Sequence, residues 1–253
     1  MPGHSEIRGD LEFELGIPIP GRILPPERWT RTALKKVPEG PIDWAGLFGR
    51  TAPVILDIGC GNGRFLLHSA VARPACDHLG VDALPVVIRY ATRRANQRGL
   101  ANARLAVIGG RELLQDHVLP GSVAEIHCYH PQPYYRKEEI PRRLITPEFV
   151  RLLHAALAPG GRLFLQTDHP AYWDYIQTLL PVFFDWTERT DPWPDTLQGR
   201  TRREIQARRQ KLKIFRGEGV ARGDLDPFEA ERLANELPLP RFNADRKAKG
   251  NRR

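Results

Sequence analysis

The chain has 253 residues, of which 41% are apolar and 27% charged, with 38 Lys and Arg against 30 Asp and Glu. This length is enough for one large domain with appendages or for two small domains. The apolar and charged fractions are close to the average of globular proteins, which excludes wholesale disorder. Three unclustered cysteines, Cys60, Cys76 and Cys128, exclude a disulfide framework and a closed zinc site, so we expect no metal and a reduced, cytoplasmic setting.

The charge and hydropathy patterns bear on the partners of the chain. No uncharged apolar run reaches the roughly 18–20 residues of a membrane helix, and the N-terminus lacks the apolar core of a signal peptide. We therefore expect neither a membrane partner nor export. The net charge of +8 favours a polyanionic partner, although basic surfaces also occur on proteins that bind nothing charged.

The first segment of the chain differs from the rest. Residues 1–53 hold eight prolines and no sustained helical or alternating pattern. Proline lacks a backbone N–H and interrupts regular elements. We predict an extended arm over residues 1–50, with one short helix around Trp44–Phe48.

From Val54 onward, apolar runs of strand length alternate with amphipathic stretches of helix length. This alternation is typical of βαβ units and predicts an α/β fold with a doubly wound, mostly parallel sheet. The expected strands are Val54–Ile58, His78–Val81, Ala103–Ile108, Val123–Tyr129, Arg162–Thr167 and a terminal strand near Lys213–Arg216. The expected helices are Arg64–Val71, Leu84–Arg98, Glu112–His117, Pro147–Ala158 and Ala171–Leu180. This domain covers residues 51–220, and residues 221–253 form an extension whose basic tail, 239–253, we predict to be disordered.

A glycine loop gives the sharpest local signal. Gly59, Gly61 and Gly63 follow the first strand of the domain and precede a helix. Glycines at such a turn let the backbone approach a ligand closely, although a purely structural turn is the alternative. A dinucleotide fingerprint would need glycine at position 64, where the chain has Arg64, which argues against a nicotinamide-dependent dehydrogenase.

Two aspartates flank this loop in the predicted sheet. Asp82 ends the second strand, where a carboxylate can accept hydrogen bonds from both hydroxyls of a ribose; the alternative is an N-cap for the helix starting near Leu84. Asp57 interrupts an apolar strand, and a buried carboxylate is costly unless it is paired. A ligand ammonium or sulfonium would pair it, and so would the N–H groups of the loop itself.

Several motifs occur together in a characteristic order. They are Phe48-Gly49-Arg50, the glycine loop, His130-Pro131-Gln132-Pro133-Tyr134-Tyr135-Arg136-Lys137, Arg142-Arg143-Leu144, Thr146-Pro147-Glu148-Phe149, Pro159-Gly160-Gly161, Thr167-Asp168 and Thr201-x-x-Glu204. In this combination, from about Trp44 to Arg216, the chain resembles the bacterial tRNA (guanine-N7-)-methyltransferases, which methylate a guanine in the variable loop.

The resemblance implies a fold, a cofactor and a partner. The fold would be the seven-stranded Rossmann-like sheet of class I methyltransferases, the cofactor S-adenosyl-L-methionine and the partner tRNA, with the protein a monomer or homodimer. The cofactor residues it implies are Asp57, Gly59, Gly61, Gly63, Asp82 and Gly109. The substrate residues it implies are Arg136, Asp168, Thr201 and Glu204.

The chain departs from the family at two places. The family has Phe-Pro-Asp-Pro-Trp-Pro-Lys at the edge of the methyl-transfer site, where this chain has Gln132 for the aspartate and Tyr134 for the tryptophan. Gly109 stands where an acidic residue is expected to meet the adenine amine. Guanine N7 carries a lone pair and no proton, so transfer needs no general base and Gln132 can still offer a carbonyl oxygen; we expect a slower enzyme.

Each of these assignments has an alternative. Glu204 can pair with Arg208 one helical turn away, and Asp168 can cap the helix near Pro170. Tyr134 and Tyr135 can pack instead of stacking on a base. Three basic clusters can form a track for the RNA backbone or a solvated face. They are Arg200, Arg202, Arg203, Arg208, Arg209, Lys211, Lys213 and Arg216; Arg136, Lys137, Arg142 and Arg143; and Arg246, Lys247, Lys249, Arg252 and Arg253. The alternative functions are a small-molecule methyltransferase and a non-catalytic RNA-binding protein.

Overall fold

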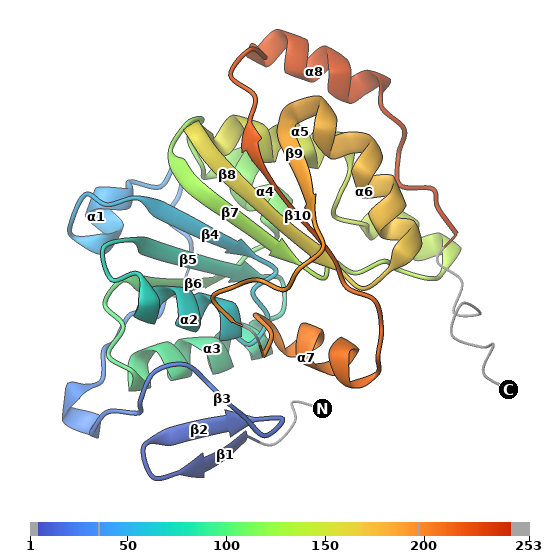
Figure 1. The fold of residues 1–253 in the computed structure, drawn as a ribbon. Coiled ribbons are helices and arrows are strands. Elements are labelled where there is room, and N and C mark those ends of the chain that lie inside the picture. The colour runs from blue at the N-terminus through green and yellow to red at the C-terminus, as the bar shows by residue number, and fades with distance from the viewer. Residues whose placement is uncertain (1–4, 35, 197, 244–253) are drawn as a thin grey trace, which may run out of the picture.

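A seven-stranded sheet forms the centre of the computed structural model, which describes residues 5–34, 36–196 and 198–243. The strand order is β6-β5-β4-β7-β8-β10-β9 (Figure 1). The strands are β4 (Val54–Ile58), β5 (Asp77–Asp82), β6 (Ala103–Val107), β7 (Val123–Tyr129), β8 (Leu157–Thr167), β9 (Phe184–Arg189) and β10 (Phe215–Ala221). Strand β10 runs antiparallel to both of its neighbours and the other pairs are parallel, which confirms the predicted mostly parallel α/β sheet.

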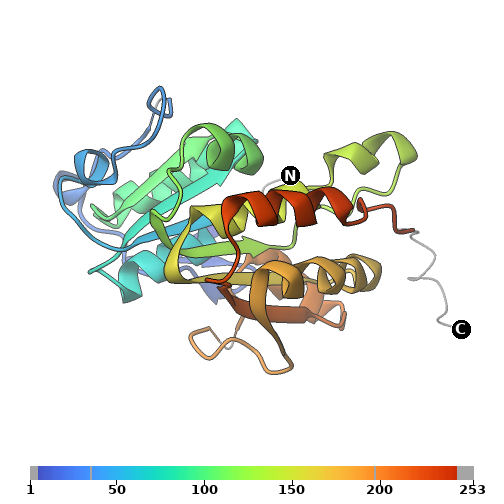
Figure 2. The ribbon, with the colours of Figure 1, turned by 90° about the horizontal axis from the view of Figure 1, so that it is seen from above.

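Helices cover both faces of this sheet. They are α1 (Trp44–Phe48), α2 (Arg64–Ala72), α3 (Pro85–Gln97), α4 (Gly110–Asp116), α5 (Pro147–Ala156), α6 (Pro170–Phe183), α7 (Arg202–Arg209) and α8 (Pro227–Glu236). Helices α2 and α3 share one apolar cluster with Leu105, whereas α4, α5, α6 and α8 share another with Ala106. Neighbouring residues of a strand point to opposite faces, so this division defines two helical layers. Helix α8 packs on α5, and Figure 2, seen from above, shows α8 lying over this layer of helices.

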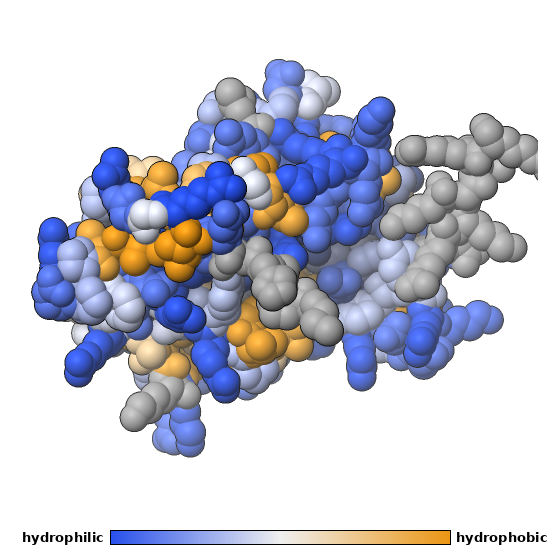
Figure 3. All heavy atoms as spheres, turned by 90° about the horizontal axis from the view of Figure 1, so that it is seen from below, coloured by the Kyte–Doolittle hydropathy of each residue, from blue (hydrophilic) through white to orange (hydrophobic). Residues whose placement is uncertain are grey.

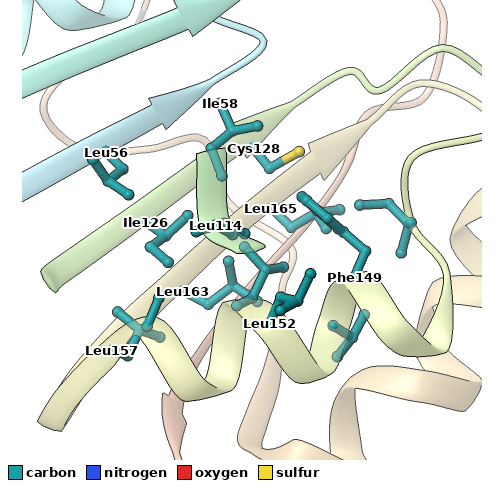
Figure 4. Close-up of a cluster of buried hydrophobic side chains, with 14 of the residues drawn as sticks. Leu56, Ile58, Leu114, Ile126, Cys128, Phe149, Leu152, Leu157, Leu163 and Leu165 are labelled. Atoms are coloured by element: carbon teal, nitrogen blue, oxygen red, sulfur yellow. The ribbon is translucent and has the colours of Figure 1, made fainter. Parts of the chain in front are cut away.

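The larger apolar cluster lies between the sheet and α5. Side chains from β4, β7 and β8 point toward the helix, as Figure 4 shows for Leu56, Ile58, Ile126, Cys128, Leu163 and Leu165. Helix α5 presents Phe149 and Leu152 to them. Its start is defined locally, because the Thr146 hydroxyl accepts from the Phe149 N–H at 3.1 Å and Pro147 occupies the first turn. The strands that carry the site are therefore held on a packed layer.

The second half of the sheet differs from the prediction. Strand β9 was not expected, because only Phe184 of its six residues is fully buried and an edge strand gives no apolar run. Strand β10 begins two residues later than Lys213 and extends through Gly217 and Gly219, which in sequence indicate a turn. A Cβ on Gly217 would lie 2.1 Å from the Trp186 ring, so glycine lets this indole lie flat on the strand.

The N-terminal segment contains a small sheet that the sequence did not indicate. Its strands are β1 (Ser5–Arg8), β2 (Leu11–Glu14) and β3 (Ile17–Pro18), and the 3-10 turn η1 (Pro26–Arg28) follows. Strands of two to four residues are too short for a sustained pattern, and the alternation in β2 buries its glutamates instead of its apolar residues. Strand β2 buries Glu12 and Glu14; Glu12 forms ion pairs with Arg94 (2.9 Å) and Arg98 (3.1 Å) of the α3 region. The short helix predicted at Trp44–Phe48 is confirmed as α1.

The described residues include neither a candidate membrane helix nor a candidate metal cluster. No helix among them has the length and apolar character needed to cross a membrane. No group of three or more His, Cys, Asp or Glu side chains in the same residues is arranged to hold a metal ion.

Candidate active site

The glycine loop lies at the point where the strand order reverses. From β4 the chain proceeds to β5 and β6 on one side of the sheet and then crosses to β7 on the other. Open α/β sheets bind ligands in the crevice outside the carboxyl ends of the strands at such a point. The backbone N–H groups of Gly59 and Cys60 donate to the Val81 carbonyl at 2.8 and 3.0 Å, which ties the loop to the end of β5.

The three glycines have different physical roles. Gly59, Gly61 and Gly63 all have φ between +54° and +76°, a region that L side chains rarely adopt. A Cβ on Gly59 or Gly61 would meet no atom within 4 Å, so the backbone there borders open space. A Cβ on Gly63 would lie 2.8 Å from the Ala91 Cβ, so this glycine permits close packing of α2 on α3.

Asp57 is the unusual buried group of the site. Its side chain is 2% exposed and Oδ2 has no hydrogen-bond partner among the described residues. Burial, reinforced by the nearby Asp82 carboxylate, raises the pKa of Asp57 to about 8, although a hydrogen bond from the Leu66 N–H acts in the opposite direction. The sequence left open whether the loop's N–H groups satisfy Asp57; here the one backbone donor comes from α2, and an oxygen remains to accept from a ligand.

Asp82 lies beside the glycine loop at the end of β5. One carboxylate oxygen accepts from the Gly61 N–H at 3.1 Å and the other from the Leu84 N–H at 2.9 Å. The N-cap of α3 is Leu84, so the interpretation of Asp82 as the cap was wrong. Each oxygen keeps a further lone pair, so the partly exposed carboxylate can still accept hydrogen bonds from the two hydroxyls of a ribose.

Gly109 follows β6 and is the N-cap of α4. A Cβ at this position would lie 3.9 Å from Oε2 of Glu112 and would meet nothing closer. The missing acidic side chain therefore leaves room at the end of β6, and the exposed carboxylate of Glu112 stands next to that room.

Gln132 lies in the loop that follows β7 and is exposed. The loop is anchored by Arg143, whose guanidinium donates to the Pro133 carbonyl at 2.6 Å and the Tyr134 carbonyl at 2.9 Å. Arg143 was predicted to contact the RNA backbone. It is 2% exposed, and it anchors this loop inside the protein instead. Arg136 is exposed at the start of the 3-10 turn η2 (Lys137–Arg142), where it is free of this anchor.

A chain of hydrogen bonds connects the ends of β7 and β8 to α7. Trp193 donates to Oε1 of Gln166 at 2.7 Å, so the Gln166 amide nitrogen faces His130 Nε2 at 2.8 Å. His130 Nδ1 then donates to Asp168 at 3.0 Å. Burial would raise the pKa of Asp168, but the hydrogen bonds from His130 and Arg203 hold that pKa well below its usual range. The cap of α6 is His169, so Asp168 does not cap that helix.

Thr201 and Glu204 belong to the first turn of α7. The Thr201 hydroxyl accepts from the Glu204 N–H at 3.0 Å and the Glu204 carboxylate accepts from the Arg200 N–H at 2.8 Å, an arrangement close to a capping box. Glu204 is fully buried and also pairs with Arg208 at 2.6 Å and Arg216 at 3.0 Å. The predicted pair with Arg208 is therefore present, and the capping box is a signal in Thr-x-x-Glu that we missed.

The N-terminal sheet brings the glycine loop and α7 together. Oε1 of Glu14 accepts from Asn62 of the glycine loop at 2.6 Å and from Arg202 of α7 at 3.4 Å. The same oxygen lies 3.5 Å from the Arg94 guanidinium of α3. Glu14 is 1% exposed, so one buried carboxylate connects the segments predicted to hold the cofactor and the base.

Most of the arginine run on and near α7 is paired inside the protein. Arg200 binds Asp195 and Tyr129, Arg203 binds Asp168, and Arg216 is buried against Glu204. The expected phosphate track along this run is therefore wrong for Arg200 and Arg216. The tail cluster from Arg246 onward lies outside the described residues. The view from below, toward the side of α7 and the N-terminal sheet, is mostly hydrophilic with separate hydrophobic patches (Figure 3).

Comparison with known sequences gives a consistent set of relatives. A family model described as "Putative methyltransferase" matches residues 51–217. A tRNA (guanine-N(7)-)-methyltransferase from Nitrosococcus oceani is 32% identical over 196 residues, covering 75% of this chain and 83% of that protein. Proteins of the same name from Alkalilimnicola ehrlichii and Halorhodospira halophila are 36% and 40% identical over 61% and 55% of this chain. The chain spans 64% and 61% of the length of these two relatives.

Solved structures with a similar fold act on RNA according to their titles. The 16S rRNA methyltransferase KamB superposes with a TM-score of 0.55 at 19% identity, covering 74% of this chain and 96% of that one. The 16S rRNA (adenine(1408)-N(1))-methyltransferase from Catenulisporales acidiphilia gives 0.51 at 18% identity, covering 77% and 98%. At these identities the likeness shows the fold alone.

Proposed function

Because this chain belongs to the tRNA (guanine-N(7)-)-methyltransferase family, we propose that it transfers a methyl group from S-adenosyl-L-methionine to N7 of a guanine in the variable loop of tRNA. The observation that carries the proposal is the unpartnered Oδ2 of Asp57 under a glycine loop that faces open space. A buried carboxylate oxygen of this kind calls for a cation, and the cofactor carries both an ammonium and a sulfonium.

The residues around the loop fit such a cofactor. Asp57 would hold the cationic end, the backbone at Gly59 and Gly61 would lie against the ligand, and Asp82 would accept from the ribose hydroxyls. Glu112, beside Gly109, is the acidic side chain available at the end of β6. When bound, the cofactor supplies an electrophilic methyl group.

The chain's own contribution to the transfer is positioning. Guanine N7 has a lone pair and no proton, so no side chain has to remove one. Holding the reacting atoms in line can contribute up to roughly 7–11 kcal/mol to lowering the barrier. Gln132 lies on a loop anchored by Arg143 and would offer its carbonyl oxygen to the charge that develops on the imidazole ring.

Recognition of guanine would use α7. A carboxylate that accepts from N1–H and the exocyclic amine distinguishes guanine from adenine, whose edge has the opposite donor pattern. Oε2 of Glu204 accepts the Arg200 N–H, and the carboxylate also receives a side-chain hydrogen bond from Gln166, so the base would take the place of one of these donors. Because Glu204 is fully buried, α7 must shift for its carboxylate to meet the base. Thr201, Asp168 and Arg136 would complete the substrate side.

The proposal is tested with labelled S-adenosyl-L-methionine and tRNA transcripts that keep or lack the variable-loop guanine. Label transfer to the guanine-containing transcript alone is expected. Binding of cofactor with transfer to a small molecule instead would support a small-molecule methyltransferase. RNA binding with no transfer to any acceptor would support a non-catalytic protein, the alternative that the exposed Gln132 in place of an aspartate favours.

A further inference from the structure

Four of the arginines without internal partners gather away from α7. Among the described residues, the side chains of Arg28, Arg31, Arg89 and Arg93 form no hydrogen bond or ion pair, and all four are exposed. Two come from the segment after the N-terminal sheet and two from α3. In a chain whose other arginines are mostly paired, this group is cationic surface that no internal carboxylate neutralises.

Three of these arginines line an open cleft. The cleft has a volume of about 640 Å³ and lies between residues 26–31 and the outer side of α3. Arg31, Arg89 and Arg93 border it together with Trp29, and Glu27 is the acidic side chain in its lining. Arg89 and Arg93 are one helical turn apart, which places them on the same side of α3. The cleft therefore combines a surplus of positive charge with an aromatic ring.

The walls of the cleft are held in place. Oδ1 of Asn96 accepts from the Thr30 hydroxyl at 3.2 Å and from the Thr32 N–H and hydroxyl at 3.0 and 2.8 Å, which fastens the segment to α3. The indole N–H of Trp29 donates to the Leu24 carbonyl at 2.7 Å, yet the side chain is 40% exposed. A flat ring that is already oriented loses little conformational freedom when a planar ligand stacks on it.

We infer that this cleft binds a single-stranded segment of the RNA substrate, with a base stacked on Trp29 and phosphates on Arg31, Arg89 and Arg93. The inference rests on the proposed function and adds a second contact region to it. Aromatic rings flanked by cations are the arrangement that binds unpaired nucleotides. Helix α3 starts three residues after Asp82 and borders the cleft farther along, so it connects the proposed cofactor site with the cleft, and a tRNA is large enough to reach both.

The experiment measures tRNA affinity by fluorescence anisotropy over a series of salt concentrations. Trp29→Ala should weaken binding about tenfold, whereas Trp29→Phe should keep most of the affinity, because a phenyl ring also stacks. In Arg89→Gln/Arg93→Gln, the slope of log K against log salt should become shallower by roughly 0.7–0.9 per lost phosphate contact. Arg151→Gln/Arg232→Gln removes the same charge from α5 and α8 and should bind as the wild type. Binding of S-adenosylhomocysteine confirms that each variant is folded.

The outcomes separate the cleft from the proposed function. If the wild type methylates tRNA and the cleft variants bind it with unchanged affinity and salt slope, the cleft is not an RNA site and the proposed function stands. If the wild type transfers no methyl but the cleft variants lose RNA, the proposed function fails and RNA binding at the cleft is supported. Binding of polyglutamate is measured for the same proteins. If the cleft variants lose polyglutamate but keep the RNA affinity of the wild type, the cleft is a peptide site and the inference is overturned.

Discussion

The charge state of Asp57 connects the sequence of β4 to ligand binding. An aspartate in an otherwise apolar strand is held protonated in the cofactor-free protein, because burial raises its pKa to about 8. A cation placed next to Oδ2 favours the ionised form and lowers that pKa. The residue therefore releases its proton when a cationic ligand arrives.

This predicts proton release on cofactor binding. At pH 6.5, S-adenosyl-L-methionine should release up to one proton from the wild-type protein and close to none from Asp57→Asn. Calorimetry in two buffers of different ionisation enthalpy gives the number directly. Equal release by the wild type and the variant would show that Asp57 does not meet the cationic end of the ligand.

A second prediction concerns the side chain of Gln132, which is exposed. Gln132→Asp should raise the methyl-transfer rate about five- to tenfold, because an ionised acceptor makes stronger hydrogen bonds than an amide. Gln132→Asn is the matched control, since it has the length of aspartate without the charge. Single-turnover rates with saturating tRNA measure the effect, and an Asn variant that gains as much as the Asp variant would rule out the charge as its cause.

At the scale of elements, the buried carboxylate of Glu204 joins α7 to Arg216 of β10. Glu204→Ala would leave Arg216 buried without its partner, and breaking such a pair typically costs about 3–5 kcal/mol. The free energy of unfolding in denaturant should fall by about this amount. Glu204→Ala/Arg216→Met should recover part of the loss, because it also removes the uncompensated charge; a double variant less stable than Glu204→Ala would contradict this account.

The sequence predicts those elements whose pattern is local. Strand β4 is buried along its whole length and leads into three glycines, so the strand, the loop and α2 could all be read from adjacent residues. Only the start of strand β10 could be predicted, near Lys213–Arg216, because Gly217 farther along is required by the Trp186 ring of a neighbouring strand.

The site is predictable to the same extent. The glycine loop and Asp82 carry their signal within a few residues. The contacts of Glu14 with Asn62 and of Asp168 with Arg203 join residues 48 and 35 positions apart, and no local pattern announces them. The cleft beside Trp29 was missed for this reason, since its arginines come from two segments that meet only in the fold.

At the scale of the whole molecule, buried titratable groups make opposing contributions to stability. Asp57 has a folded pKa of about 8, above that of an exposed aspartate, so its contribution is complete at low pH and is lost as the pH rises toward 8. Burial lowers the pKa of His78 to about 3 and that of His127 to about 4, below that of an exposed histidine. Their contribution is complete above pH 6.5 and is lost as the pH falls.

The free energy of unfolding of the cofactor-free protein should therefore be greatest near pH 6.5. Between pH 4 and 6.5 the histidines with lowered pKa, His68 included, outweigh one aspartate, so stability rises with pH. Between 6.5 and 8 the Asp57 contribution dominates and stability falls, with a slope of at most about 1.4 kcal/mol per pH unit. Denaturant unfolding at a series of pH values measures the profile. Asp57→Asn should abolish the decline above pH 6.5 and keep the acid limb, because the asparagine has no proton to lose. Parallel profiles for the wild type and this variant would mean that the carboxyl of Asp57 titrates at its ordinary pKa. The argument that Oδ2 of Asp57 binds a cationic ligand under the glycine loop would then fail.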